Sequence, residues 1–285
     1  MSQALREHKL PAMAAAGSSM FAQVGRVTVR GADLMVEIVG SDGPAFVWCH
    51  GVLSSRAQED ADGLFDWRAV VDQRWRWVRY DARGHGQSTG TNNVAAYSWG
   101  ELSRDCVGLA DALGIPRFAA GGASMGCATV LEAALAAPHR IDRLVLVTPP
   151  AAWENHAVQA EHYRTNAAYV RSQGDDEGMA AVSVDARPPI LASMGLPTPN
   201  YAPASPELLP AILRGVAASD LPPPQKLAEL EQPALILAWD TDPAHPLATA
   251  ERLAEILPRA DLHVARTLRQ IRDWPRLVGG FMGVA

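Results

Sequence analysis

The sequence predicts an α/β protein built on a mostly parallel β-sheet with helices on both faces. Short, continuously apolar runs at 45–49, 144–148 and 234–239 have the composition of strands that are buried on both faces. Amphipathic segments of helical length separate such runs along much of the chain. Strands that alternate with helices favour parallel pairing, because each helix returns the chain to the same edge of the sheet.

Eight strands are expected. Residues 26–30 and 34–39 alternate polar and apolar side chains, as half-exposed strands do, and Gly31 and Asp33 provide a tight turn between them. Six further runs are also expected to be strands. They are residues 45–49, 76–80, 118–121, 144–148, 234–239 and 262–265.

Helices are expected between these strands. Ser98 and Glu101 form a capping-box pattern at the start of 98–113, and Gly114 follows its end. Pro138 stops the alanine-rich helix that begins at Ser124. The expected helices are 58–74, 98–113, 124–137, 157–172, 249–257 and 274–281.

The segment 151–231 differs from the rest of the chain. It has no buried-strand pattern, and ten of the 21 prolines lie between Pro188 and Pro224, which disfavours long helices there. We therefore expect one core formed by 21–150 and 232–285, with 151–231 inserted into it. Residues 1–20 are expected to be a loose leader, because their alanine patch is too short for a signal peptide.

Composition excludes several classes of function. The chain has 285 residues and a net charge of −6, which gives no electrostatic basis for binding nucleic acid or an anionic membrane. No apolar run approaches the ~20 residues of a membrane span. The three scattered cysteines fit a reducing compartment and have no metal-ligand spacing, so we expect a cytoplasmic protein with no metal or cofactor. Its oligomeric state is not predicted.

The strongest chemical signal is the G-x-S-x-G motif at Gly122–Gly126, between a strand and a helix. A turn from strand to helix in one residue strains the backbone of Ser124, and side chains at the flanking positions would clash. The hydroxyl is then presented at a helix N-terminus, where developing negative charge is stabilised. Ser124 is the expected nucleophile, and the N–H of Met125 is one expected oxyanion donor.

Two further motifs follow strand ends. His50-Gly51-Val52 forms an open turn, whose Val52 N–H is the second expected oxyanion donor and whose His50 and Gly51 are expected to line the substrate pocket. The segment from Asp81 to Ser88 contains Asp81 and Arg83, which are expected to form a hydrogen-bonded corner. Its Gly84-His85-Gly86 is not a dinucleotide fingerprint, because Thr89 stands where the third glycine belongs.

In this order the three motifs resemble those of the α/β-hydrolase fold family: His50-Gly51, Asp81-x-Arg83-Gly84-His85-Gly86-x-Ser88 and Gly122-x-Ser124-x-Gly126. The similar branch contains small bacterial esterases, enol-lactonases, carbon–carbon bond hydrolases and cofactor-free haloperoxidase-like enzymes. The resemblance covers about 21–281 and implies that 151–231 is a cap over the active site. Caps of this family form the pocket roof, so Trp153 is a pocket candidate.

The resemblance also implies a triad in the chain order Ser, Asp or Glu, His. The D-x-x-x-P spacing after the strand 234–239 selects Asp242 with Pro246, and Asp240 is the alternative. The family's histidine lies after the last strand, but here that loop, 266–273, has neither a histidine nor a glycine. A serine hydroxyl becomes a good nucleophile only when a base removes its proton. This sequence therefore departs from the family pattern at the residue that activates the nucleophile.

His245, in the acid loop, is the leading candidate for the base. His263 lies in the last strand, His156 and His162 could enter from the cap, and His50, His85 and His139 are more typical of structural positions. A further alternative is that no histidine acts as the base.

The expected function is hydrolysis of a small carboxylic ester or lactone. The alternatives are a binding protein with a vestigial elbow, or a lyase or isomerase that uses the pocket alone.

Overall fold

The computed structural model describes residues 22–40, 43–71, 75–173, 189–192 and 206–283. The predicted leader, 1–20, lies outside them. No helix among the described residues is long and apolar enough to cross a membrane.

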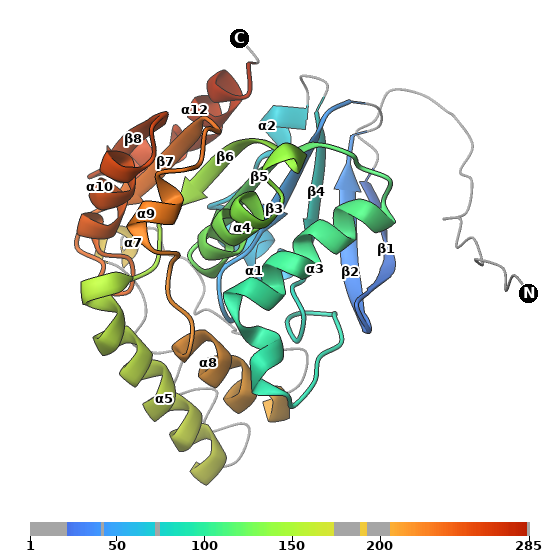
Figure 1. The fold of residues 1–285 in the computed structure, drawn as a ribbon, viewed down its shortest axis with the longest axis vertical. Helices are drawn as coiled ribbons and strands as arrows, with labels where there is room; N and C mark the ends of the chain where they lie inside the picture. The colour runs from blue at the N-terminus through green and yellow to red at the C-terminus, as the bar shows by residue number, and fades with distance from the viewer. Residues whose placement is uncertain (1–21, 41–42, 72–74, 174–188, 193–205, 284–285) are drawn as a thin grey trace, which may run out of the picture.

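The described strands form one eight-stranded sheet in the order β1-β2-β4-β3-β5-β6-β7-β8 (Figure 1). The first two pairings, β1 with β2 and β2 with β4, are antiparallel, and all the others are parallel. This confirms the predicted fold class. The strands are β1 (Ala22–Val29), β2 (Ala32–Val39), β3 (Ala45–Cys49), β4 (Arg76–Tyr80), β5 (Phe118–Ala123), β6 (Ile141–Val147), β7 (Ala234–Trp239) and β8 (Ala260–Ala265).

Helices cover both faces of this sheet, as the strand β3 illustrates. Its residues alternate between two apolar clusters: Val47 and Cys49 pack on one side, and Phe46 and Trp48 pack on the other. The first side is covered by α3 (Trp99–Ala112), α4 (Met125–Ala136) and α10 (Leu247–Ile256). The second is covered by α1 (Arg56–Asp62), α2 (Arg68–Val71), α11 (Leu268–Arg272) and α12 (Trp274–Phe281).

The predicted single helix over 58–74 is wrong, because α1 and α2 are separate. Gly63 ends α1 in the left-handed conformation with φ 62°, and its N–H donates to the carbonyl of Glu59. Asp66 then accepts a hydrogen bond from the backbone N–H of Arg68 at 3.0 Å, which starts α2. Residues 72–74 lie outside the described residues.

The segment between β6 and β7 contains α5 (His156–Gln173), α7 (Pro189–Ala192), α8 (Leu209–Ala217) and α9 (Pro224–Leu227). Figure 1 shows α5 and α8 side by side at one end of the sheet. They share an apolar cluster with Tyr97 of the short 3₁₀ helix η1 (Val94–Tyr97) and with Leu53, which follows β3. The inserted segment is therefore anchored to loops at the carboxyl ends of the core strands. The shorter 3₁₀ helices are η2 (Pro138–Arg140), η3 (Trp153–Asn155) and η4 (Pro206–Leu208).

Candidate active site

Ser124 lies at the junction of β5 and α4 and has a strained backbone. Its φ is 52° and its ψ is −113°, a conformation that costs a residue with a side chain about 1–3 kcal/mol. Its N–H donates to the carbonyl of Val147 at 3.1 Å, and its carbonyl accepts from the N–H of Cys127 at 2.9 Å. The chain therefore enters α4 directly, with the serine at the turn.

The two motif glycines are required by close backbone packing. A Cβ atom on Gly122 would lie 2.4 Å from the carbonyl carbon of Gly126. A Cβ atom on Gly126 would lie 2.0 Å from the carbonyl oxygen of Cys49, at the end of β3. Both distances are far below contact, so side chains at these positions are incompatible with this turn.

Other strained residues lie near Ser124. Leu53 and Thr148 follow β3 and β6, the two neighbours of β5 in the sheet, and Thr241 follows β7, the next strand after β6; each has a positive φ between 45° and 60°. Strained residues cluster at functional sites more than elsewhere in proteins. The carboxyl edge of these adjacent strands is also where open α/β sheets bind their ligands.

A narrow cleft opens beside Ser124. Its walls come from the core and from the inserted segment, and α5 supplies residues spaced at one helical turn. The lining residues are Trp99, Ser124, Met125, Pro150, Ala151, His156, Gln159, Ala160, Tyr163 and Val216. The sequence analysis singled out His156 within the inserted segment but missed Trp99 and Gln159.

Two backbone N–H groups close to Ser124 are free. A Cβ atom placed on Gly51 would lie 3.5 Å from Cβ of Ser124, so the turn after β3 passes beside the nucleophile. Within the described part of the chain, neither the N–H of Val52 nor that of Met125 donates a hydrogen bond. Both are thus available to a ligand, as the expected oxyanion hole requires.

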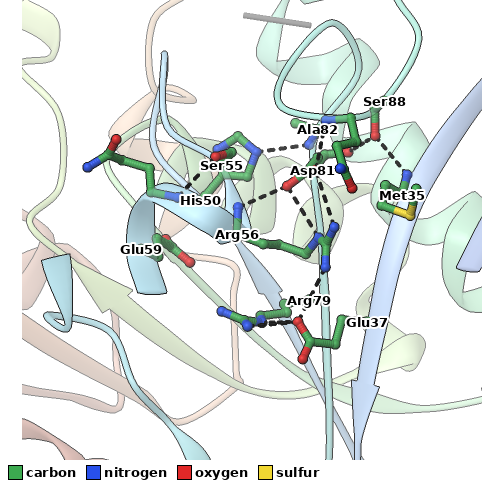
Figure 2. Close-up of polar contacts among 12 residues, drawn as sticks. Met35, Glu37, His50, Ser55, Arg56, Glu59, Arg79, Asp81, Ala82 and Ser88 are labelled. Atoms are coloured by element: carbon green, nitrogen blue, oxygen red, sulfur yellow. Dashed lines mark hydrogen bonds and ion pairs between the residues drawn. The ribbon is translucent and has the colours of Figure 1, made fainter. Parts of the chain in front are cut away.

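His50 holds the turn in place instead of lining the cleft. It is 1% exposed, and its Nδ1 donates to the carbonyl of Gly51 at 2.7 Å. Its Nε2 accepts from the N–H of Ala82 at 2.9 Å, a contact visible in Figure 2. Burial lowers the pKa of His50, so the ring is a neutral brace between the ends of β3 and β4. This corrects the expectation that His50 lines the pocket.

Asp81 and Arg83 do not form a corner with each other. Figure 2 shows Asp81 as the centre of a network, in which it accepts from the backbone N–H of Arg56 at 2.9 Å. It also accepts from the N–H of Gln87 at 2.9 Å. Arg83 pairs instead with Asp105 of α3 through two bonds of 2.8 Å. Each residue therefore ties its loop to a different helix.

Asp242 and His245 form a hydrogen-bonded pair in the loop after β7. Nδ1 of His245 lies 2.7 Å from Oδ2 of Asp242, and the indole N–H of Trp239 donates to the same oxygen at 2.7 Å. Burial alone would raise the pKa of Asp242, but the charge of His245 and the bonds from His245, Trp239 and the Ala244 N–H hold it below its usual value. The acid is therefore ionised and accepts from Nδ1 of His245.

A backbone contact places this loop against the cleft. The carbonyl of Ala244, next to His245, accepts from the N–H of Ala151 at 3.0 Å, and Ala151 lines the cleft with Ser124. The side chain of His245 is 21% exposed. Among the described residues no hydrogen bond joins the Ser124 hydroxyl to an imidazole, and such bonds are often long before substrate binds.

The other candidates lie in different surroundings. Asp240 faces Arg266 at 3.7 Å, and His263 pairs with Asp261 on the exposed side of β8. His85 is buried beside His50, with ring centroids 5.2 Å apart. His139 and His162 are exposed. Trp153 donates its indole N–H to the carbonyl of Pro222 at 3.1 Å and is not among the residues that line the cleft.

The loop after β8, where the resemblance places the histidine, forms α11. Thr267 caps this helix by accepting from the N–H of Gln270 at 3.3 Å. The hollow around it is lined by Thr267, Arg269, Gln270, Arg272, Asp273 and Arg276, and no histidine is among these residues. The base must therefore come from another element if there is one.

A model of the α/β-hydrolase fold family matches residues 44–174. The chain is also 31% identical over 208 residues to the RutD protein of Caulobacter sp. (strain K31), which is provisionally named a carbamate hydrolase. That similarity covers 67% of this chain and 72% of RutD. The chain belongs to the α/β-hydrolase family.

Solved structures of α/β-hydrolases share this fold over nearly the whole chain. A hydrolase from Pseudomonas aeruginosa PA01 is 26% identical with a TM-score of 0.75, covering 91% of this chain and 98% of that one. The enol-lactonase from Burkholderia xenovorans LB400 is 22% identical with a TM-score of 0.64, covering 91% of this chain and 100% of that one. The predicted family resemblance is confirmed.

Proposed function

We propose that this α/β-hydrolase cleaves small carboxylic esters or lactones with Ser124 as its nucleophile. The observation that carries the proposal is the strained serine at the cleft, with the Asp242–His245 pair on the loop bonded to the same cleft wall. A hydroxyl, an imidazole and an oriented acid are the parts of a serine hydrolase. The narrowness of the cleft favours small acyl groups.

The reaction runs in two halves. Ser124 Oγ attacks the carbonyl carbon while His245 Nε2 takes the hydroxyl proton, and the N–H groups of Val52 and Met125 hold the oxyanion. When the carbon–oxygen bond to the leaving group breaks, the imidazolium returns the proton to the departing alkoxide. Water then attacks the acyl-enzyme with the same base, which releases the acid and restores Ser124. Asp242 keeps the imidazole in the required tautomer throughout.

Carbamates are a second candidate substrate class. The RutD relatives carry the name of carbamate hydrolases, and a carbamate presents the same carbonyl to the same nucleophile. The machinery would be unchanged, and only the leaving group or the acyl part would differ.

The test of the nucleophile is direct. We expect a fluorophosphonate to label the wild-type protein at Ser124, as located by peptide mass spectrometry, and p-nitrophenyl acetate to be hydrolysed. Ser124→Ala should lose both, whereas Ser219→Ala, which removes a buried serine hydroxyl outside the cleft lining, should keep the label. A wild-type protein that is neither labelled nor active would favour the binding-protein alternative. Hydrolysis that survives in Ser124→Ala would remove Ser124 from the mechanism.

A further inference from the structure

The cleft contains polar groups that the proposed hydrolysis does not use. Trp99, at the start of α3, lines the cleft and is only 3% exposed. Its indole N–H is buried and finds no acceptor among the described residues. A buried donor without an acceptor is costly. A bound molecule that offers an acceptor to this N–H therefore removes a cost that the free protein carries.

Position distinguishes Trp99 from other buried indoles. The N–H groups of Trp67 and Trp77 also lack an acceptor in the described part of the chain. Both side chains pack in the apolar cluster on the opposite face of the sheet, and neither lines the cleft. A ligand held at Ser124 is adjacent to Trp99 alone.

Gln159 brings a second polar group to the same cleft. The residues of α5 that line the cleft are His156, Gln159, Ala160 and Tyr163, so their spacing places them on one helix face. Gln159 is half-buried, and its amide makes no hydrogen bond within the described residues. An amide has N–H groups to donate, as Trp99 does.

The charge of the lining decides which acceptor fits. No Asp, Glu, Lys or Arg is among the residues that line the cleft. A carboxylate taken out of water there would have no guanidinium or ammonium group beside it, and burying a charge is far more costly than burying a neutral oxygen. An uncharged oxygen is satisfied by N–H donors alone.

We propose that Trp99 and Gln159 select substrates with a short acyl chain that carries a second, uncharged hydrogen-bond acceptor, such as a keto or amide oxygen, in addition to the scissile carbonyl. This inference rests on the proposed hydrolysis at Ser124 and specifies its substrate class. Trp99 and Gln159 bind the acyl chain, and neither takes part in the chemical step.

The test compares two p-nitrophenyl esters, the 4-oxopentanoate and the pentanoate, which differ by a keto oxygen in place of two hydrogens. Each kcat/KM is divided by the rate constant of hydroxide hydrolysis, which removes the inductive effect of the keto group. We expect the wild-type protein to prefer the 4-oxopentanoate by about tenfold or more, since one well-placed hydrogen bond supplies roughly this factor. Trp99→Phe and Gln159→Leu should each reduce this ratio about fivefold.

Trp77→Phe is the matched control, because it removes an equally unpartnered indole N–H away from the cleft and should leave the ratio unchanged. If Trp99→Phe does not fold, Gln159→Leu on the half-buried face of α5 decides. A wild-type ratio near one, or a ratio that neither cleft variant alters, overturns the inference and leaves the hydrolase proposal standing. A protein that hydrolyses neither ester and takes no fluorophosphonate label overturns the hydrolase proposal, and the inference falls with it.

Discussion

His245 donates from Nδ1 to Asp242 at a distance of 2.7 Å, and the two residues lie in one loop after β7. The family pattern that the sequence resembles divides these roles between that loop and the one after the last strand. Here the second loop is occupied by α11. The contact between Ala244 and Ala151 fixes the single remaining loop to the cleft wall. The acid and the proposed base are thus positioned together.

The first prediction concerns the base. His245→Ala should lower kcat/KM for p-nitrophenyl acetate by about 10²–10⁴-fold, the usual contribution of general acid–base catalysis. His263→Ala is the matched control, because His263 also pairs with an aspartate, Asp261, but its side chain is 39% exposed on β8. It should retain full activity. Should His156→Ala abolish activity while His245→Ala does not, the base would belong to α5.

The second prediction concerns the acid. Asp242→Asn keeps the shape of the side chain but no longer fixes the His245 tautomer, so kcat should fall by about 10²–10⁴-fold with little change in KM. Asp240→Asn is the control, since Asp240 faces the exposed Arg266 at 3.7 Å. Ester hydrolysis under saturating substrate measures the effect. Equal losses in the two variants would refute the choice of Asp242.

Strand positions were readable from the sequence where burial is complete. The predicted strands 45–49 and 234–239 match β3 and β7 at both ends, because a strand covered on both faces must be apolar throughout. The predicted strand 76–80 also matches β4, although it carries Arg76 and Arg79. The helix breaks were harder to see. Gly63 and the Thr267–Gln270 cap are ordinary helix signals, but apolar residues continue on both sides of Gly63, and Thr267 follows directly after a strand.

The cleft lining could not be derived in the same way. Trp99 and Gln159 are 60 residues apart in the sequence. That both line one cleft depends on how α5 packs on the core. The sequence of α5 has little amphipathic contrast to indicate its buried face. The role of His50 was ambiguous for a related reason, because only the position of the Ala82 N–H shows that its ring is already occupied.

The third prediction tests the packing of the elbow. Gly126→Ala puts a Cβ atom 2.0 Å from the carbonyl oxygen of Cys49. Overpacking a core usually costs about 1–3 kcal/mol, so the free energy of unfolding should fall by that amount or more. Gly280→Ala in α12 meets nothing within 4 Å and should raise it by up to about 1 kcal/mol. Urea unfolding measures both. A Gly126→Ala protein of wild-type stability would contradict the close approach of β3 to α4.

The fourth prediction separates a buried ion pair from an exposed one. Asp105 is 1% exposed and holds Arg83 through two hydrogen bonds, so Asp105→Asn leaves a buried guanidinium without its counter-charge and should cost about 3–5 kcal/mol of unfolding free energy. Asp142→Asn breaks the exposed pair with Arg117 and should cost less than about 1 kcal/mol. Similar losses in the two variants would show that the Arg83 loop is not held through Asp105.

The last prediction concerns Glu59, whose carboxyl is buried beneath Trp48. Burial raises the pKa of Glu59 to about 8, against the opposing effects of the Trp48 N–H and of Arg79. The unfolded chain releases this proton near 4.5, so the folded state binds more protons between the two values. The free energy of unfolding should therefore fall as the pH rises from about 5 to about 8, and the contribution of Glu59 is constant above that range.

Glu59→Gln keeps an acceptor for the Trp48 N–H but cannot ionise, so the unfolding free energy of this variant should decline less steeply with pH. Glu255→Gln, whose side chain is 66% exposed, should follow the wild-type slope in urea titrations across this range. A Glu59→Gln protein with the wild-type slope would mean that Glu59 is already ionised at neutral pH in the folded protein.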